Sequence, residues 1–139
     1  IRDRALSPGI NDPFTANTCI DWIGDGLAEV TRRKIPPSFR CAEDGRARLW
    51  VPATTFEQLT DVAFDQIRRA GAGQASVIHR LLDTIASVGR LASRRDDRAA
   101  LSRHADWILE AARGAGYERH DLEEIEARHG RVVADLNRR

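Results

Sequence analysis

Three carboxylate side chains recur at intervals of four residues near the beginning of the sequence, at Asp21, Asp25 and Glu29. Residues four apart lie one above the other on a helix, so all three are expected to project from one helical face. Such a row could bind a metal ion or dock a partner. It is also typical of an ordinary solvated helix face, and the sequence favours that simpler interpretation.

A second set of charged residues with helical spacing follows at Asp61, Asp65 and Arg68. We expect these side chains to share the outward face of one helix, with Asp65 and Arg68 one turn apart. This pair could take part in binding a small polar ligand, which makes both residues candidates for a functional site. A solvated surface pair is the alternative, and such pairs contribute little to stability.

The histidines and cysteines lack the spacing of a metal site. Metal-binding histidines often occur as His-x-x-x-His, which places two ligands on one helical face. His104 and His129 instead fall among apolar residues, which predicts core or boundary positions with satisfied hydrogen bonds. Cys19 and Cys41 are too few for a disulfide framework or a four-thiolate zinc site and are expected to be buried thiols. We therefore predict no metal and no cofactor.

Several other kinds of chemistry lack their sequence signatures. There is no Gly-x-Ser-x-Gly motif, and nothing ties Ser7 or a cysteine to a histidine. The glycine-rich stretch at 71–73 is too short for a phosphate loop and lacks a preceding strand. The formal net charge of +1 gives no electrostatic case for nucleic acid. No small-molecule partner is identifiable, and the sequence leans away from an enzyme.

The most constrained stretch of the chain runs from Ala5 to Ala16 and contains two prolines. Its Pro-Gly pair predicts a type II turn over Ser7–Ile10. Asp12 precedes Pro13, which pushes it into the extended geometry that an N-cap residue needs. Proline is favoured at the first helical position, so a helix is expected to begin at Pro13 with Asp12 as its cap. The stretch is either a helix start alone or a functional loop.

Apolar residues spaced at three and four positions predict five helices. The first runs from Pro13 to about Arg33 and stops at Pro36–Pro37, the second opens at Thr54 or Thr55, the third spans about Ser76–Ser93, the fourth follows a polar connector at 94–97 and runs through Arg113, and the last starts at Asp121. Capping boxes are expected for Thr55 with Gln58 and for Asp121 with Glu124. The third helix is the most apolar and is expected at the centre of the core.

The segment Ser38–Val51 lacks the helical period and is typical of a β-hairpin with a turn at Asp44–Gly45. The predicted fold class is therefore mainly α: a bundle-like domain of about five helices with one β-hairpin between the first two. A length of 139 residues suits a single domain over 1–139 with one core.

Trp22 lies outside the buried stripe of the first helix, and Phe14 lies farther round, near the acidic row. Aromatic residues are enriched at the cores of protein interfaces. We therefore expect this helix face to contact something beyond the domain's own core. The alternative is that the hairpin or Trp50 folds over Trp22 within the same chain.

Two observations bear on the larger protein. No apolar run approaches the roughly 20 residues needed to cross a bilayer, and no signal peptide is visible. Methionine is absent, including at position 1, which leads us to expect a fragment of a longer protein.

The run from Arg4 to Ala16, RALSPGINDPFTA, resembles the signature of a bacterial family of predicted integral membrane proteins, domain of unknown function 2254. Cys19–Gly24, the Asp44–Gly45 turn and Phe64–Arg68 are similar more loosely. In such proteins, predicted transmembrane helices precede a region similar to this one. The resemblance implies the soluble C-terminal module of a cell-membrane protein, on its cytoplasmic side. The family has no established catalytic or binding residues that could be carried over.

Two functional classes remain. The first is a module that docks against its own transmembrane region or forms a homo-oligomer, which could regulate transport. The second is an enzyme or small-ligand sensor that uses the Ser7–Thr15 loop with Asp65 and Arg68. The ligand or interface candidates are Ser7, Asn11, Asp12, Thr15, Trp22, Asp65 and Arg68. The sequence offers no acid–base or nucleophile constellation, which favours the first class.

Overall fold

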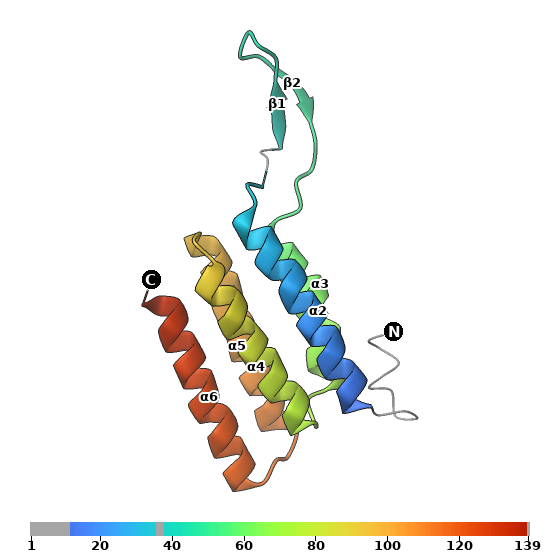
Figure 1. Cartoon of the computed structure of the whole chain (residues 1–139), viewed down its shortest axis with the longest axis vertical. Coiled ribbons are helices and arrows are strands. Elements are labelled where there is room, and N and C mark those ends of the chain that lie inside the picture. The colour runs from blue at the N-terminus through green and yellow to red at the C-terminus, as the bar shows by residue number, and fades with distance from the viewer. Residues whose placement is uncertain (1–11, 36–37, 139) are drawn as a thin grey trace.

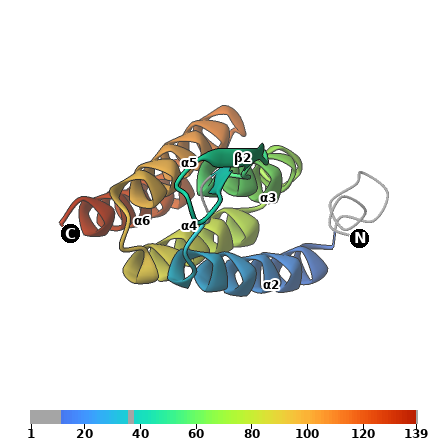
Figure 2. The same ribbon diagram turned by 90° about the horizontal axis from the view of Figure 1, so that it is seen from above.

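The computed structural model describes residues 12–35 and 38–138. Within them, five helices pack together and a two-stranded antiparallel hairpin separates the first two (Figures 1 and 2). The elements are α2 (Pro13–Arg32), β1 (Phe39–Cys41), β2 (Ala47–Trp50), α3 (Phe56–Ala70), α4 (Ala75–Leu91), α5 (Arg95–Gly114) and α6 (Arg119–Asn137). The predicted fold class is confirmed. The expected turn at Ser7–Ile10, the candidates Ser7 and Asn11, and Pro36–Pro37 lie outside the described residues.

The start of α2 is built as the sequence predicts. Asp12 has an extended backbone, and its Oδ1 accepts hydrogen bonds from the amides of Phe14 (3.1 Å) and Thr15 (3.2 Å). The Thr15 hydroxyl donates to the other carboxylate oxygen. The predicted cap is confirmed, and the carboxylate occupies amide donors that an external anion would need.

The starts of α3 and α6 differ in how well they were predicted. The capping box of α3 is confirmed, because Thr55 and Gln58 bond to each other's backbone amides. The predicted box at Asp121 is wrong, since α6 begins at Arg119 with Glu118 as its N-cap. Asp121 then lies in the first turn, where its charge interacts favourably with the helix dipole without capping an amide.

The start of α5 also comes earlier than predicted. The segment 94–97 was expected to be a polar connector, yet α5 begins at Arg95. Asp96 and Asp97 fall in the first turn, where acidic charge stabilises a helix. Asp97 is buried and pairs with Arg94 at 2.7 Å, which fixes the turn between α4 and α5.

The most apolar helix, α4, lies at the centre of the bundle as predicted and packs against α2, α5 and α6. Its buried residues include Val77, Ile78, Leu81, Leu82, Ile85 and Val88. The approach to α2 is closest at Gly24, where an added Cβ would lie 2.7 Å from Cγ2 of Thr84. Glycine at this position therefore lets the two helices meet.

The hairpin extends away from the bundle at the end where α2 stops (Figure 1). Phe39 pairs with Trp50 and Arg40 with Leu49 across the two strands. All residues of both strands are exposed. The expectation of two buried thiols is therefore wrong for Cys41, whereas Cys19 in α2 is buried.

Candidate functional site

Two of the predicted site residues, Asp65 and Arg68, form an ion pair within α3, with Nη2 of Arg68 3.2 Å from Oδ1 of Asp65. The side chain of Arg68 is only 16% exposed. Its guanidinium lies over the ring of Trp107 in α5, 5.7 Å from the ring centroid. The expected outward orientation is therefore wrong for Arg68, because the tryptophan of a neighbouring helix covers its cation in a cation–π contact.

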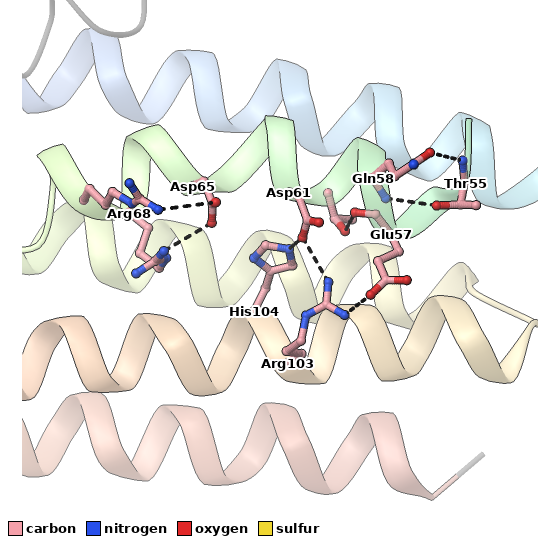
Figure 3. A network of polar contacts seen from close by, with 10 residues as sticks. Thr55, Glu57, Gln58, Asp61, Asp65, Arg68, Arg103 and His104 are labelled. Carbon is pink, nitrogen blue, oxygen red and sulfur yellow. Dashed lines mark hydrogen bonds and ion pairs between the residues drawn. The ribbon is translucent and has the colours of Figure 1, made fainter. Parts of the chain in front are cut away.

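The same face of α3 continues into a polar network with α5 (Figure 3). Oδ1 of Asp61 lies 2.9 Å from Nη2 of Arg103 and 2.9 Å from Nε2 of His104. Arg103 also pairs with Glu57, and its guanidinium lies 4.9 Å from the Trp107 centroid. Partial burial opposes the charge of Arg103, but the hydrogen bonds that the guanidinium donates to both carboxylates outweigh this effect and raise its pKa.

His104 is the chemically distinctive member of this network. Its side chain is fully buried, with the rings of Phe64 and Trp107 edge-on at centroid distances of 5.5 and 5.1 Å. Burial holds the pKa of His104 below its usual 6.5, although the hydrogen bond with Asp61 works in the opposite direction. The neutral ring then donates from Nε2 to the carboxylate, which leaves Nδ1 as an acceptor. Nδ1 has no hydrogen-bond partner among the described residues.

A carboxylate that orients a histidine is also the arrangement of a catalytic general base. That role requires the second ring nitrogen to reach a substrate. Here Nδ1 belongs to a ring with 0% exposure, closed in by Phe64 and Trp107. The Asp61–His104 pair is therefore suited to joining α3 to α5 inside the bundle. Burial and the bond to Asp61 agree with the predicted core position of His104, although one ring nitrogen is left without a partner.

Sequence reasoning missed two members of this network, Glu57 and Arg103. A signal for the first was present, because Glu57 precedes Asp61 and Asp65 at the same interval of four residues. Such spacing places all three on one face of α3. The helix that this face meets could not be derived from the spacing, so Arg103 could not have been assigned as its partner.

The ligand site predicted from the sequence combines the Ser7–Thr15 loop with Asp65 and Arg68. In the structure, the described candidates from the loop and those from α3 form two separate pairs. Asp12 and Thr15 are bonded to each other in the first turn of α2, and Asp65 is bonded to Arg68 within α3. The hydroxyl of Thr15, followed by its amide, holds the pKa of Asp12 below its usual 3.8. An open depression of about 280 Å³ beside α3 is lined by Asp61, Val62, Asp65 and Gln66. A ligand-binding role for these residues stays a prediction.

Several other titratable side chains have partners of their own. Asp21 in the acidic row of α2 lies 3.5 Å from Arg80, and Glu29 lies 2.9 Å from Arg33. His129 lies 2.7 Å from Asp106 across α5 and α6, with a side chain 16% exposed, in agreement with a boundary position. In the part of the chain that the structure describes, no group of three or more His, Cys, Asp or Glu side chains is arranged to hold a metal ion.

Trp22 and Phe14 stand out on the surface of α2. Trp22 is 68% exposed and Phe14 is 80% exposed. The alternative that the hairpin or Trp50 folds over Trp22 is wrong, because the hairpin projects away from the bundle and Trp50 is itself 60% exposed. The face of α2 that carries Trp22 therefore remains a candidate contact surface.

Comparison with known proteins gives a family and a set of distant relatives. A family model described as a predicted membrane protein, DUF2254, matches residues 1–87. Uncharacterized proteins from Mycobacterium bovis and from the CDC 1551 and H37Rv strains of Mycobacterium tuberculosis are each 28% identical over 109 residues. These matches cover 78% of this chain but only 21% of each relative, so the chain spans about a fifth of their length.

No solved structure shows a significant match to the chain. No helix among the described residues is both long and apolar enough to cross a bilayer.

Proposed function

Because this chain belongs to the DUF2254 family of predicted membrane proteins, we propose that it is a non-catalytic extramembrane module that docks against the membrane-spanning part of its own protein. The relatives extend far beyond the matched segment, which leaves ample chain for such a contact. A module docked on transmembrane segments can bias their conformational equilibrium, which would link it to the regulation of transport.

The observation that carries the proposal is the exposed face of α2. Phe14 and Trp22 leave large aromatic surfaces in water, at 80% and 68% exposure. Aromatic side chains are enriched at the cores of interfaces, and tryptophan is enriched among the few residues that carry most of the binding energy. The neighbouring carboxylates Asp21 and Asp25 would provide a polar rim for this contact. A second copy of the chain is the competing occupant of the same face.

The enzyme or sensor alternative has weaker support. Asp65 and Arg68 neutralise each other, and the carboxylate of Asp12 is occupied by the first turn of its own helix. A ligand would have to replace these contacts before it gained any of its own. No observation on the described residues favours this alternative over docking.

We propose that the module lies on the cytoplasmic side of the membrane. Basic residues near membrane-spanning segments are most frequent on that side. Arg32, Arg33 and Lys34 form a basic cluster where α2 ends, which is consistent with that side. Cys41 is exposed and Cys19 is buried, so a membrane-impermeant maleimide should label Cys41 only in vesicles that expose the cytoplasmic face.

The docking proposal is tested by replacing Phe14 and Trp22 with alanine in two settings, the 139-residue chain and the full-length protein in membranes. Exposed side chains contribute little to the stability of the chain alone, so its free energy of unfolding should change by less than about 0.5 kcal/mol. In the full-length protein, loss of a docked aromatic surface should lower the thermal midpoint by several degrees.

Val62→Ala provides the matched control, because Val62 is 67% exposed on α3 and should affect neither setting. Equal effects of the α2 substitutions in both settings would contradict docking. Loss of self-association in the isolated chain, with unchanged stability, would assign the face to a second copy instead.

A further inference from the structure

The hairpin, here residues 39–51, carries an apolar surface that the bundle does not cover. Four large side chains are between 39% and 60% exposed: Phe39, Leu49, Trp50 and Val51. An isolated two-stranded hairpin is at best marginally stable in water. Several large apolar side chains left exposed on one short element indicate a site of interaction with a protein or a membrane.

The two aromatic residues lie on the same face of the hairpin. Phe39 and Trp50 are directly paired across the strands, and residues directly opposite each other share a face. Arg48 lies two residues before Trp50 on β2, but the pairing register shifts between Arg40 and Cys41, so alternation along the strand does not assign its side chain to a face. Arg40 and Arg48 both lie within two residues of the aromatic pair along the strands, and aromatic rings together with cations anchor proteins at the membrane–water interface.

The charge of this region differs from that of the rest of the chain. Residues 32–51 contain six basic and two acidic side chains, whereas the remaining residues contain 16 basic and 19 acidic ones. The two acidic residues are Glu43 and Asp44 in the turn, and Asp44 is paired with Arg48 at 3.1 Å. The positive charge is therefore concentrated away from the turn, at the end of the hairpin that adjoins Arg32–Lys34 and carries the apolar side chains.

The two ends of the helical bundle also differ in charge. Arg94 in the turn between α4 and α5 lies at the hairpin end, since it donates a hydrogen bond to the carbonyl of Arg33 (2.9 Å). α6 begins at the opposite end (Figure 1), and its start carries one basic residue, Arg119, among four acidic ones: Glu118, Asp121, Glu123 and Glu124. An anionic surface would attract the hairpin end and repel the other, which orients the molecule before contact.

We infer that the hairpin lies in the headgroup region of an anionic lipid bilayer, with Phe39 and Trp50 facing the acyl chains and the surrounding basic residues at the lipid phosphates. The strands contain only three and four residues, whereas a membrane-spanning strand needs about 9–11, so the hairpin lies on the bilayer and does not cross it. Hairpin-to-hairpin pairing of two copies is disfavoured because it would bring like charges together. This inference rests on the proposed position of the module beside a membrane.

The test is sedimentation of the 139-residue chain with lipid vesicles. Binding is expected to vesicles of phosphatidylcholine with phosphatidylglycerol, to weaken with salt, and to be lost on phosphatidylcholine alone. Phe39→Ser with Trp50→Ser should weaken binding about tenfold or more. The matched control is Phe14→Ser with Trp22→Ser, which removes the same two residue types from α2.

Charge is tested by a second matched pair of variants. Arg40→Glu with Arg46→Glu should weaken binding to the anionic vesicles about tenfold or more, because each basic residue near the surface contributes to the attraction. Arg119→Glu with Arg131→Glu changes the net charge equally, but on α6, and should have a much smaller effect.

Insertion of the hairpin is tested by tryptophan fluorescence. Brominated lipids should quench the fluorescence of Trp50. This quenching should be abolished by Trp50→Phe and retained in Trp22→Phe.

Equal binding to both kinds of vesicle, or equal losses from the hairpin variants and their α2 and α6 controls, would overturn the inference. Loss of self-association in the hairpin variants with vesicle binding unchanged would assign the hairpin to a second copy. Failure of vesicle binding alone leaves the docking of α2 intact, because that proposal is measured by the stability of the full-length protein with Phe14 and Trp22 replaced.

Discussion

His104 illustrates how surroundings decide what a side chain can do. Beside a carboxylate such as Asp61, a solvent-accessible histidine would be a candidate general base. Enclosed by Phe64 and Trp107, the same ring becomes a neutral hydrogen-bond donor inside the bundle. The difference is one of access and burial, which sequence spacing alone does not report.

A pH-dependent loss of stability is expected from this residue. Burial holds the pKa of His104 below 6.5 in the folded state, so the unfolded chain binds the proton more tightly. The contribution of neutral His104 to the free energy of unfolding is therefore fully present above pH 6.5 and is lost as the pH falls through the folded pKa. The free energy of unfolding should fall by at most about 1.4 kcal/mol per pH unit in this range.

The measurement is urea unfolding at a series of pH values between about 7.5 and 5, where the linkage acts. His104→Phe should flatten the pH dependence even if it also changes the absolute stability. His129→Gln, at the boundary position on α6, serves as the control. An NMR titration that gave His104 a pKa at or above 6.5 would contradict the account.

Arg68 shows the limit of residue-level prediction. Its spacing from Asp65 correctly placed the two in one ion pair. The position of Trp107, far along the sequence in α5, decides that the guanidinium is covered and not solvated. Helical periodicity assigns a residue to a face, but the identity of the neighbouring helix comes from the tertiary packing.

At the scale of the helices, local signals predicted the structure where side chains bond to nearby backbone. The caps at Asp12 and at Thr55 with Gln58 are both formed. The start of α6 was missed because acidic residues near a helix start stabilise it either as caps or through the dipole. Asp121 acts in the second way, and Glu118 takes the capping position.

Two glycines in α2 give a matched prediction about packing. A methyl group added at Gly26 would meet only open space, so Gly26→Ala should raise the free energy of unfolding by about 0.5–1 kcal/mol through helix propensity. At Gly24, the added Cβ would lie 2.7 Å from Cγ2 of Thr84, a β-branched residue with a stiff side chain. Gly24→Ala should therefore lower the free energy of unfolding by about 1–3 kcal/mol.

Urea unfolding of the two variants checks this prediction. Thr84→Ser removes the clashing methyl group, so the Gly24→Ala, Thr84→Ser double variant should recover much of the loss. Equal effects of alanine at positions 24 and 26 would show that α2 and α4 are not as close as the structure places them.

The whole molecule presents two kinds of exposed aromatic surface. Phe14 and Trp22 lie beside carboxylates on α2, and Phe39 and Trp50 lie beside basic residues on the hairpin. The helices and the hairpin were predictable from periodicity and turn residues. The projection of the hairpin from the end of the bundle was not, because it depends on which surfaces the core leaves uncovered. We expect the two surfaces to have different occupants, a protein for α2 and lipid for the hairpin.

The most direct test of the docking role is photo-crosslinking from position 22 in the full-length protein in its native membrane. A photoreactive amino acid in place of Trp22 should form crosslinks to the membrane-spanning part of the same protein, identified by mass spectrometry. The same amino acid at Glu110, exposed on α5, should form none. Absence of any protein crosslink from position 22, or equal crosslinking from both positions, would contradict the account.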